Sequence, residues 1–409
     1  MIRHARTTTL LVATVLGLGA CAADEVVAPT AGVIALSSAP IPAYGPWAEI
    51  IHGEAGPGAL YELRMPAADK WNGKVVYYAH GFNDPGDALA LPFKENIEAT
   101  FNALGEKGYA IAASSFSENG FAVKDGVQRT HQLRGLFTSR FGQADNSYLM
   151  GHSLGGAIVV ELAEKYPNQY DGALAMCGVV GGSQLQIDYL GNVRAAFDAI
   201  YVNAIRGDAV NIPADLTRDE VRNAALAAMS ANPLGAIALT RLATQKDGIV
   251  SPAHVEAPST GGVPAAIGAV LGALDFHVRG GADVIDHTQG HNPFSNIGVT
   301  YLGGFSPFTG AYIDANIERF EATPDAQNYL NHWFEPSGDL QIPLLTLHTM
   351  WDPAVPSYHE TKLADVVADA GNSAFLRQTI VPAFAHCGFS TTQTIASFQQ
   401  LVDWVNTIQ

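Results

Sequence analysis

Ser153 lies in the type of turn that exposes a serine hydroxyl group at the start of a helix. Gly151, His152, Ser153, Leu154 and Gly155 follow a short apolar run and precede a stretch of small and apolar residues. This order predicts a strand, a tight turn and a helix, because the two glycines let the strand and the helix approach closely. A serine needs a neighbouring base and oxyanion-stabilising donors before it attacks a carbonyl carbon. The motif therefore predicts partners elsewhere in the chain.

The expected base is His386 and the expected acid is Asp352. Active groups lie at the carboxyl ends of parallel strands, and the base is expected after the nucleophile and the acid in the chain. Of the 13 histidines, His386 alone follows the last predicted strand, residues 375–381. Asp352 directly follows the predicted strand 342–348, where its alternative role is that of a turn-forming Asp-Pro pair. Asp339 precedes that strand and would lie at the wrong end of the sheet.

Backbone amides are expected to stabilise the oxyanion. Leu154, directly after the nucleophile, supplies one amide from the start of the helix. The loop after the apolar run 74–79 supplies the other, from Phe82 or from its neighbour Gly81, of which we prefer Phe82. His80 in the same loop is expected to pack beneath it.

The elements that must position these groups alternate between strand and helix. Predicted strands cover residues 48–54, 59–65, 74–79, 109–114, 148–150, 172–177, 342–348 and 375–381, and predicted helices cover 94–107, 127–141, 154–165, 358–370 and 392–408. The first two strands read as an antiparallel pair. The alternation of the others implies right-handed crossovers. The predicted fold class is α/β, with a mostly parallel eight-stranded sheet and helices on both faces.

The alternation stops between residues 183 and 338, where alanine-rich helical patterns cover 192–206, 218–231 and 263–277. We therefore expect a sheet domain formed by 47–182 and 339–409, with a helical lid inserted before the acid-bearing strand. Its aromatic residues either line a substrate pocket or form its own core; they are Phe276, Phe294, Tyr301, Phe305 and Phe308.

One cluster in the insertion has the residue types of a metal site: Asp283, Asp286, His287 and His291. The nearby Gly290 and Pro293 favour a loop instead. Hydrolysis by a serine needs no metal, so we expect no metal and no other cofactor.

The first residues predict export from a bacterial cell. Residues 1–20 have a basic start and an apolar run too short to span a bilayer, which is typical of a signal peptide. Cys21 follows Leu-Gly-Ala, so it is either a lipidated first residue that anchors the protein to a membrane or part of an ordinary cleavage site of a secreted protein. Residues 21–46 then read as a tether. The formal net charge of −17 disfavours nucleic acids and anionic lipid surfaces as partners.

These residues together resemble the α/β-hydrolase superfamily, specifically its serine esterases and lipases. The resemblance rests on His80-Gly81, the motif at 151–156, Asp352 and His386, and it covers 47–182 and 339–409. It implies the α/β-hydrolase fold and hydrolysis of a small-molecule carboxylic ester through an acyl-enzyme.

A more distant likeness is to tannases and feruloyl esterases, through Trp71-Asn72-Gly73 and His386-Cys387. Those enzymes place a cysteine directly before the catalytic serine and bridge it to the cysteine after the histidine. This chain has His152 before the serine. Cys177 offers a substitute at the end of a neighbouring strand, so we expect a Cys177–Cys387 disulfide, with two separate buried thiols as the alternative.

Two other functions remain open at this stage. The same triad can cleave amides, which would make the protein a peptidase or an amidase. A surface lipoprotein could also use a hydrolase scaffold only for binding. The sequence indicates no oligomeric state.

Overall fold

The computed structural model describes residues 45–92, 95–244, 262–303 and 309–408. The predicted signal peptide, nearly all of the predicted tether, and Cys21 lie outside the described residues. Among the helices of the described residues, none combines the length and the apolar character needed to cross a membrane.

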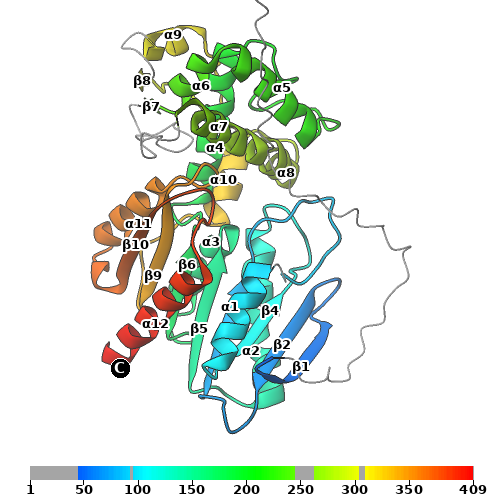
Figure 1. Cartoon of the computed structure of the whole chain (residues 1–409), viewed down its shortest axis with the longest axis vertical. Coiled ribbons are helices and arrows are strands. Elements are labelled where there is room, and N and C mark those ends of the chain that lie inside the picture. The colour runs from blue at the N-terminus through cyan, green and yellow to red at the C-terminus, as the bar shows by residue number, and fades with distance from the viewer. Residues whose placement is uncertain (1–44, 93–94, 245–261, 304–308, 409) are drawn as a thin grey trace, which may run out of the picture. The chain divides into compact units, whose positions relative to one another are not determined.

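Eight strands form the central sheet (Figure 1), in the order β1-β2-β4-β3-β5-β6-β9-β10. Their bounds are β1 (Trp47–Glu54), β2 (Leu60–Pro66), β3 (Lys74–Ala79), β4 (Ala110–Ser114), β5 (Asn146–His152), β6 (Gly172–Met176), β9 (Leu344–Trp351) and β10 (Leu376–Phe384). β2 pairs antiparallel with β1 and β4, and the remaining pairs are parallel. The predicted fold class is confirmed.

Helices cover both faces of the sheet, because the central strands are apolar on both sides. In β3, Val75 and Tyr77 pack into one core and Val76 and Tyr78 into the other, as the alternation of side chains along a strand requires. The first core includes α2 (Val123–Phe141), α3 (Leu154–Lys165) and α11 (Tyr358–Asp369). The second includes α1 (Glu95–Glu106) and α12 (Thr391–Ile408), which lie on the face turned toward the viewer in Figure 1.

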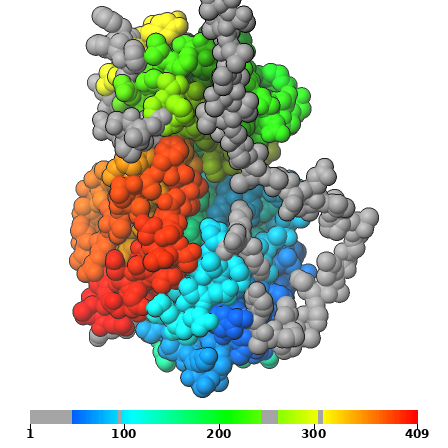
Figure 2. All heavy atoms as spheres, viewed as in Figure 1, coloured from blue at the N-terminus to red at the C-terminus, as the bar shows by residue number. Residues whose placement is uncertain are grey.

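The chain between β6 and β9, which we call the inserted segment, is mainly helical. Its elements are α4 (Ser183–Ile200), α5 (Arg218–Ala231), α6 (Pro233–Leu239), β7 (Leu242–Thr244), α7 (Gly262–Phe276), the π-helix η1 (His277–Gly281), α8 (Ala282–His287), β8 (Tyr301–Gly303), α9 (Thr309–Asn316) and α10 (Pro324–His332). In Figure 2 its green and yellow atoms border the orange atoms of the following elements. We retain 183–338 as the proposed bounds of this segment.

The first helix of the inserted segment differs most from its prediction. α4 covers Ser183–Ile200, whereas the pattern predicted 192–206. Its start is fixed by distant groups, since the Ser183 hydroxyl donates to the Trp333 carbonyl. Beyond its end the chain folds back, and the buried Arg194 guanidinium donates to the carbonyls of residues 205, 206 and 207. Neither of these contacts can be recognised from the sequence of the helix itself. The two-stranded sheet of β7 and β8 was also missed.

The Glu335 carboxylate fixes the point where the inserted segment leaves and rejoins the sheet domain. It accepts a hydrogen bond from the Gln184 amide at the start of α4 (2.8 Å). Burial raises the pKa of Glu335 to about 7.

Replacing Glu335 with glutamine is therefore expected to reduce a pH dependence of stability. A carboxyl group with a raised folded-state pKa contributes stability at low pH that is lost as the pH rises through about 7. Wild type should lose on the order of 2 kcal/mol of unfolding free energy through this group between pH 5 and pH 8.5. Urea unfolding at both pH values should show a smaller loss in Glu335→Gln; equal losses would contradict this.

Candidate active site

Ser153 occupies a strained turn between β5 and α3. Its φ is +55°, a region that residues with a side chain rarely adopt. A Cβ on Gly151 would come within 2.1 Å of the Gly155 carbonyl oxygen, and a Cβ on Gly155 equally close to the Ala79 carbonyl oxygen. Both positions therefore require glycine, and the close packing they permit holds the serine in its unusual conformation.

Three side chains from the ends of different strands form a continuous hydrogen-bonded series. The Ser153 hydroxyl donates to His386 Nε2 (2.8 Å), and His386 Nδ1 donates to Asp352 Oδ2 (2.7 Å). Asp352 follows β9 and His386 follows β10. The structure thus brings together the three residues singled out in the sequence as nucleophile, base and acid.

Asp352 is held ionised although it is fully buried. Burial alone would raise the pKa of its carboxyl group. The adjacent His386 and the hydrogen bond to it act in the opposite direction, and the net pKa lies below its usual value. Its other oxygen, Oδ1, accepts hydrogen bonds from the amides of Ala354 (2.9 Å) and Val355 (3.0 Å). These two amides fix the orientation of the carboxylate.

The loop after β3 passes directly against the nucleophile. A Cβ on Gly81 would lie 3.1 Å from the Ser153 Cβ. Phe82 follows in this loop, and Leu154 begins α3 on the other side of the serine. The His80 ring is buried, bonds to the Gly81 carbonyl oxygen through Nδ1 (2.7 Å) and stacks on Phe116 at a centroid distance of 3.8 Å. His80 thus packs beneath the loop that carries Gly81 and Phe82.

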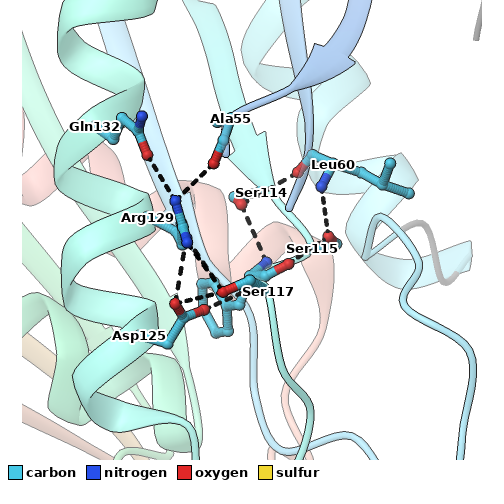
Figure 3. Close-up of polar contacts among 9 residues, drawn as sticks. Ala55, Leu60, Ser114, Ser115, Ser117, Asp125, Arg129 and Gln132 are labelled. Carbon is cyan, nitrogen blue, oxygen red and sulfur yellow. Dashed lines mark hydrogen bonds and ion pairs between the residues drawn. The ribbon is translucent and has the colours of Figure 1, made fainter. Parts of the chain in front are cut away.

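A polar network holds Phe116 and the following residues in place (Figure 3). Asp125 accepts hydrogen bonds from the amide and the hydroxyl of Ser117, both at 2.6 Å. The Arg129 guanidinium bonds to the same aspartate (3.2 Å) and donates to the Ala55 carbonyl in the β1–β2 hairpin (2.6 Å). Asp125 lies in the first turn of α2, which begins four residues before its predicted start. The network joins α2, the hairpin and the loop after β4.

Replacing Asp125 with alanine is expected to lower the free energy of unfolding by about 2–3 kcal/mol, because Arg129 would remain largely buried without its carboxylate. The matched control is Gln132→Ala, which removes an exposed partner of the same guanidinium and should cost less than about 0.5 kcal/mol. Urea unfolding of both variants tests this; equal costs would contradict a structural role for the network.

His152, directly before the nucleophile, is a buried neutral residue. Burial lowers the pKa of its imidazole to about 3. Its Nδ1 and the Tyr78 hydroxyl share a hydrogen bond of 3.0 Å. His152 therefore fills space behind the turn, at the position where tannases and feruloyl esterases carry a cysteine.

Cys177 and Cys387 form a disulfide, with their Cα atoms 5.2 Å apart. Cys177 directly follows β6, so the bridge ties the loop that carries His386 to the neighbouring strand end. Both cysteines have positive φ, as does Ala385 on the other side of the histidine.

Replacing both cysteines with alanine is expected to cost about 2–5 kcal/mol of unfolding free energy. It should also lower kcat, because the loop that carries His386 would lose its covalent link to the end of β6. Titration of the denatured protein should show two more thiols per chain after reduction than before. Equal thiol counts would show that the bridge is not formed.

The loop expected for Asp283, Asp286, His287 and His291 is wrong for the first three, which lie in α8; His291 follows outside any helix or strand. Asp283 accepts a hydrogen bond from the Phe121 amide and pairs with His287 at 3.5 Å. In the part of the chain that the structure describes, the only compact group of metal-ligating side chains is Cys177, His386 and Cys387. Its two sulfur atoms are bonded to each other, which leaves them poor ligands.

The inserted segment contributes side chains to the cavity beside Ser153. Phe276 at the end of α7 and Arg279 in η1 both line it. The Arg279 guanidinium bonds to Asp84 in the loop after β3 (3.0 Å) and to Asp275 (2.8 Å), and lies over the Phe276 ring at 4.5 Å. This places Arg279 between the inserted segment and the loop that carries Phe82. Arg279 was not among the residues expected from the sequence, because its contacts with Asp84 and Phe82 join distant parts of the chain.

The other aromatic residues considered for the substrate pocket do not supply evidence for it. Phe294 and Tyr301 are buried in the core of the inserted segment. Phe305 and Phe308 lie outside the described residues.

No protein-family model matches the chain. The o-phthalyl amidase of Xanthobacter agilis is 19% identical over 405 residues, covering 87% of this chain and 87% of the amidase. An esterase from Aspergillus oryzae has a TM-score of 0.48 and 16% identity, covering 83% of this chain and 72% of that one. The acylaminoacyl peptidase of Pyrococcus horikoshii has a TM-score of 0.44 and 11% identity, covering 88% of this chain and 41% of the peptidase, so this chain spans less than half of it.

Proposed function

We propose that this chain, which has the α/β-hydrolase fold, is a serine hydrolase that cleaves carboxylic esters of small molecules. The observation that carries the proposal is the series of hydrogen bonds from Asp352 through His386 to the Ser153 hydroxyl, at the edge of a cavity of about 260 Å³. The strained turn at Ser153 and the adjacent loop with Phe82 support the same chemistry.

In the proposed mechanism, His386 Nε2 takes the proton from Ser153 as Oγ attacks the ester carbonyl carbon. The amides of Leu154 and Phe82 donate hydrogen bonds to the oxyanion that forms. The imidazolium, stabilised by Asp352, gives its proton to the departing alcohol. Water then attacks the acyl-enzyme by the same route and releases the acid.

Ester hydrolysis is tested with purified protein and p-nitrophenyl acetate. We expect release of p-nitrophenolate well above the buffer rate, and inhibition by a fluorophosphonate in parallel with covalent labelling. Absence of both turnover and labelling would contradict the proposal and favour a binding protein on a hydrolase scaffold.

Amide hydrolysis is the second candidate. It is favoured by the likeness to an amidase along 87% of both chains, and the triad acts on both bonds. Comparing p-nitrophenyl acetate with acetyl p-nitroanilide separates the two candidates, because the acyl group is the same. We expect the ester to be turned over with the higher kcat/KM; a higher value for the anilide would make the protein an amidase.

We further propose that the protein is exported and anchored to a membrane through lipidated Cys21. The support is the basic and apolar start of the chain and its Leu-Gly-Ala-Cys sequence at 18–21. Labelling of bacterial cells with a radioactive fatty acid should mark the wild type and spare Cys21→Ser. Labelling of neither protein would contradict the anchor.

A further inference from the structure

Two cavities of very different size meet at Ser153. The larger one, about 260 Å³, is lined by Ser153, His386 and Cys387 and extends to Asn96 and Arg279. The smaller one, about 30 Å³, is lined by Ser153 and Leu154 and does not reach His386. Phe82 and Phe276 stand between them, since both residues line both cavities.

The chemistry of the triad assigns one part of an ester to each cavity. The imidazolium of His386 must protonate the departing alcohol oxygen, so the alcohol portion has to lie on the side of His386. That is the larger cavity. The acyl portion stays on Ser153 after the alcohol has left, and we assign it to the smaller cavity beside Leu154, which Ser153 also lines.

The smaller cavity limits the length of the acyl group. One water-sized group needs about 10–15 Å³ of cavity volume, so the smaller cavity, at about 30 Å³, holds about two groups of that size. Beyond the carbonyl carbon, this accommodates the methyl of an acetyl group or the ethyl of a propionyl group.

The walls of the smaller cavity come from well-packed parts of the molecule. Ile187 and Leu190 project from α4, Val179 and Val355 follow β6 and β9, and all four are buried. Val355 also donates its amide to Asp352, so it cannot move without disturbing the acid. Enlarging this space to fit a long chain would require shifts in a close-packed core.

We propose that the protein is selective for esters of short acids, of two or three carbons, with larger alcohol portions. This rests on the proposed ester hydrolysis and adds its substrate class. The short acyl group occupies the cavity lined by Ile187, Leu190 and Val355, and the alcohol portion occupies the cavity that leads to Arg279.

The experiment measures kcat/KM of the full chain for p-nitrophenyl acetate, propionate, hexanoate and octanoate, and for phenyl and 2-naphthyl acetate. We expect hexanoate and octanoate to fall at least about 100-fold below acetate, because each added methylene without a place in the pocket weakens transition-state binding. The two aryl acetates should agree within about tenfold. Equal rates for acetate and octanoate would overturn the proposal while leaving ester hydrolysis intact, whereas no turnover of any ester would contradict the proposed function itself.

Two variants change the volume of the smaller cavity in opposite directions. Leu190→Ala should raise kcat/KM for hexanoate relative to acetate at least about tenfold. Gly280→Ala adds a methyl group that meets only Phe82 Cε2, at 3.9 Å, so the backbone tolerates it and the cavity narrows. It should lower the propionate-to-acetate ratio. Leu234→Ala, half-exposed in α6, is the control and should leave both ratios unchanged. Unchanged ratios in Leu190→Ala and Gly280→Ala would overturn the assignment of this cavity.

Discussion

Replacing Ser153 with alanine is expected to lower kcat for p-nitrophenyl acetate by about 10⁶-fold. In the proposed mechanism the variant loses the oxygen that forms the acyl-enzyme, and His386 then has no hydroxyl to deprotonate. Oxyanion-stabilising amides and substrate binding remain, so a small rate above that of water should persist. KM should change little, since the Ser153 hydroxyl bonds to His386 and not to the body of the substrate.

The matched control is Ser139→Ala, which removes an exposed hydroxyl bonded only within α2. It should retain full kcat, and both variants should unfold at urea concentrations close to that of wild type. A Ser153→Ala variant that keeps more than about 1% of wild-type kcat would exclude Ser153 as the nucleophile.

Replacing Asp352 with asparagine is expected to lower kcat by about 10⁴-fold. Oδ1 accepts hydrogen bonds from the amides of Ala354 and Val355, so the asparagine oxygen should take that place. Its NH₂ group would then face His386 Nδ1 and force that nitrogen to accept. Nε2 would carry the proton and could not deprotonate Ser153.

Asp339→Asn is the control for Asp352→Asn, because Asp339 is an exposed acid before the same strand. It should keep kcat within about twofold of wild type. The comparison is made at saturating p-nitrophenyl acetate. Equal kcat values in the two variants would show that Asp352 is not the acid that orients His386.

The sheet could be predicted from the sequence because its causes are local. Strands such as β3 are buried on both faces and read as continuous apolar runs. The turn at Ser153 is marked by two glycines, at positions where a Cβ would clash with a backbone carbonyl oxygen. Position after a strand then selected Asp352 and His386, which the structure places within hydrogen-bonding distance of each other.

The inserted segment was harder to predict because distant contacts determine it. The start of α4 depends on Trp333 and Glu335, and the chain after it depends on the Arg194 side chain. Arg279 lies at the cavity in contact with Asp84 of the distant loop after β3, a contact that no local pattern reveals. Phe82 and Phe276, which line both cavities, were already candidates in the sequence, whereas Arg279, Ile187 and Leu190 came only from the structure.

The central claim is that Ser153 is the nucleophile, and covalent labelling tests it most directly. The full chain is treated with a fluorophosphonate, digested, and the modified peptide is sequenced by mass spectrometry. We expect one label per chain, on Ser153, with labelling lost in Ser153→Ala and strongly slowed in His386→Ala. A label on any other residue, or equal labelling of wild type and Ser153→Ala, would contradict it.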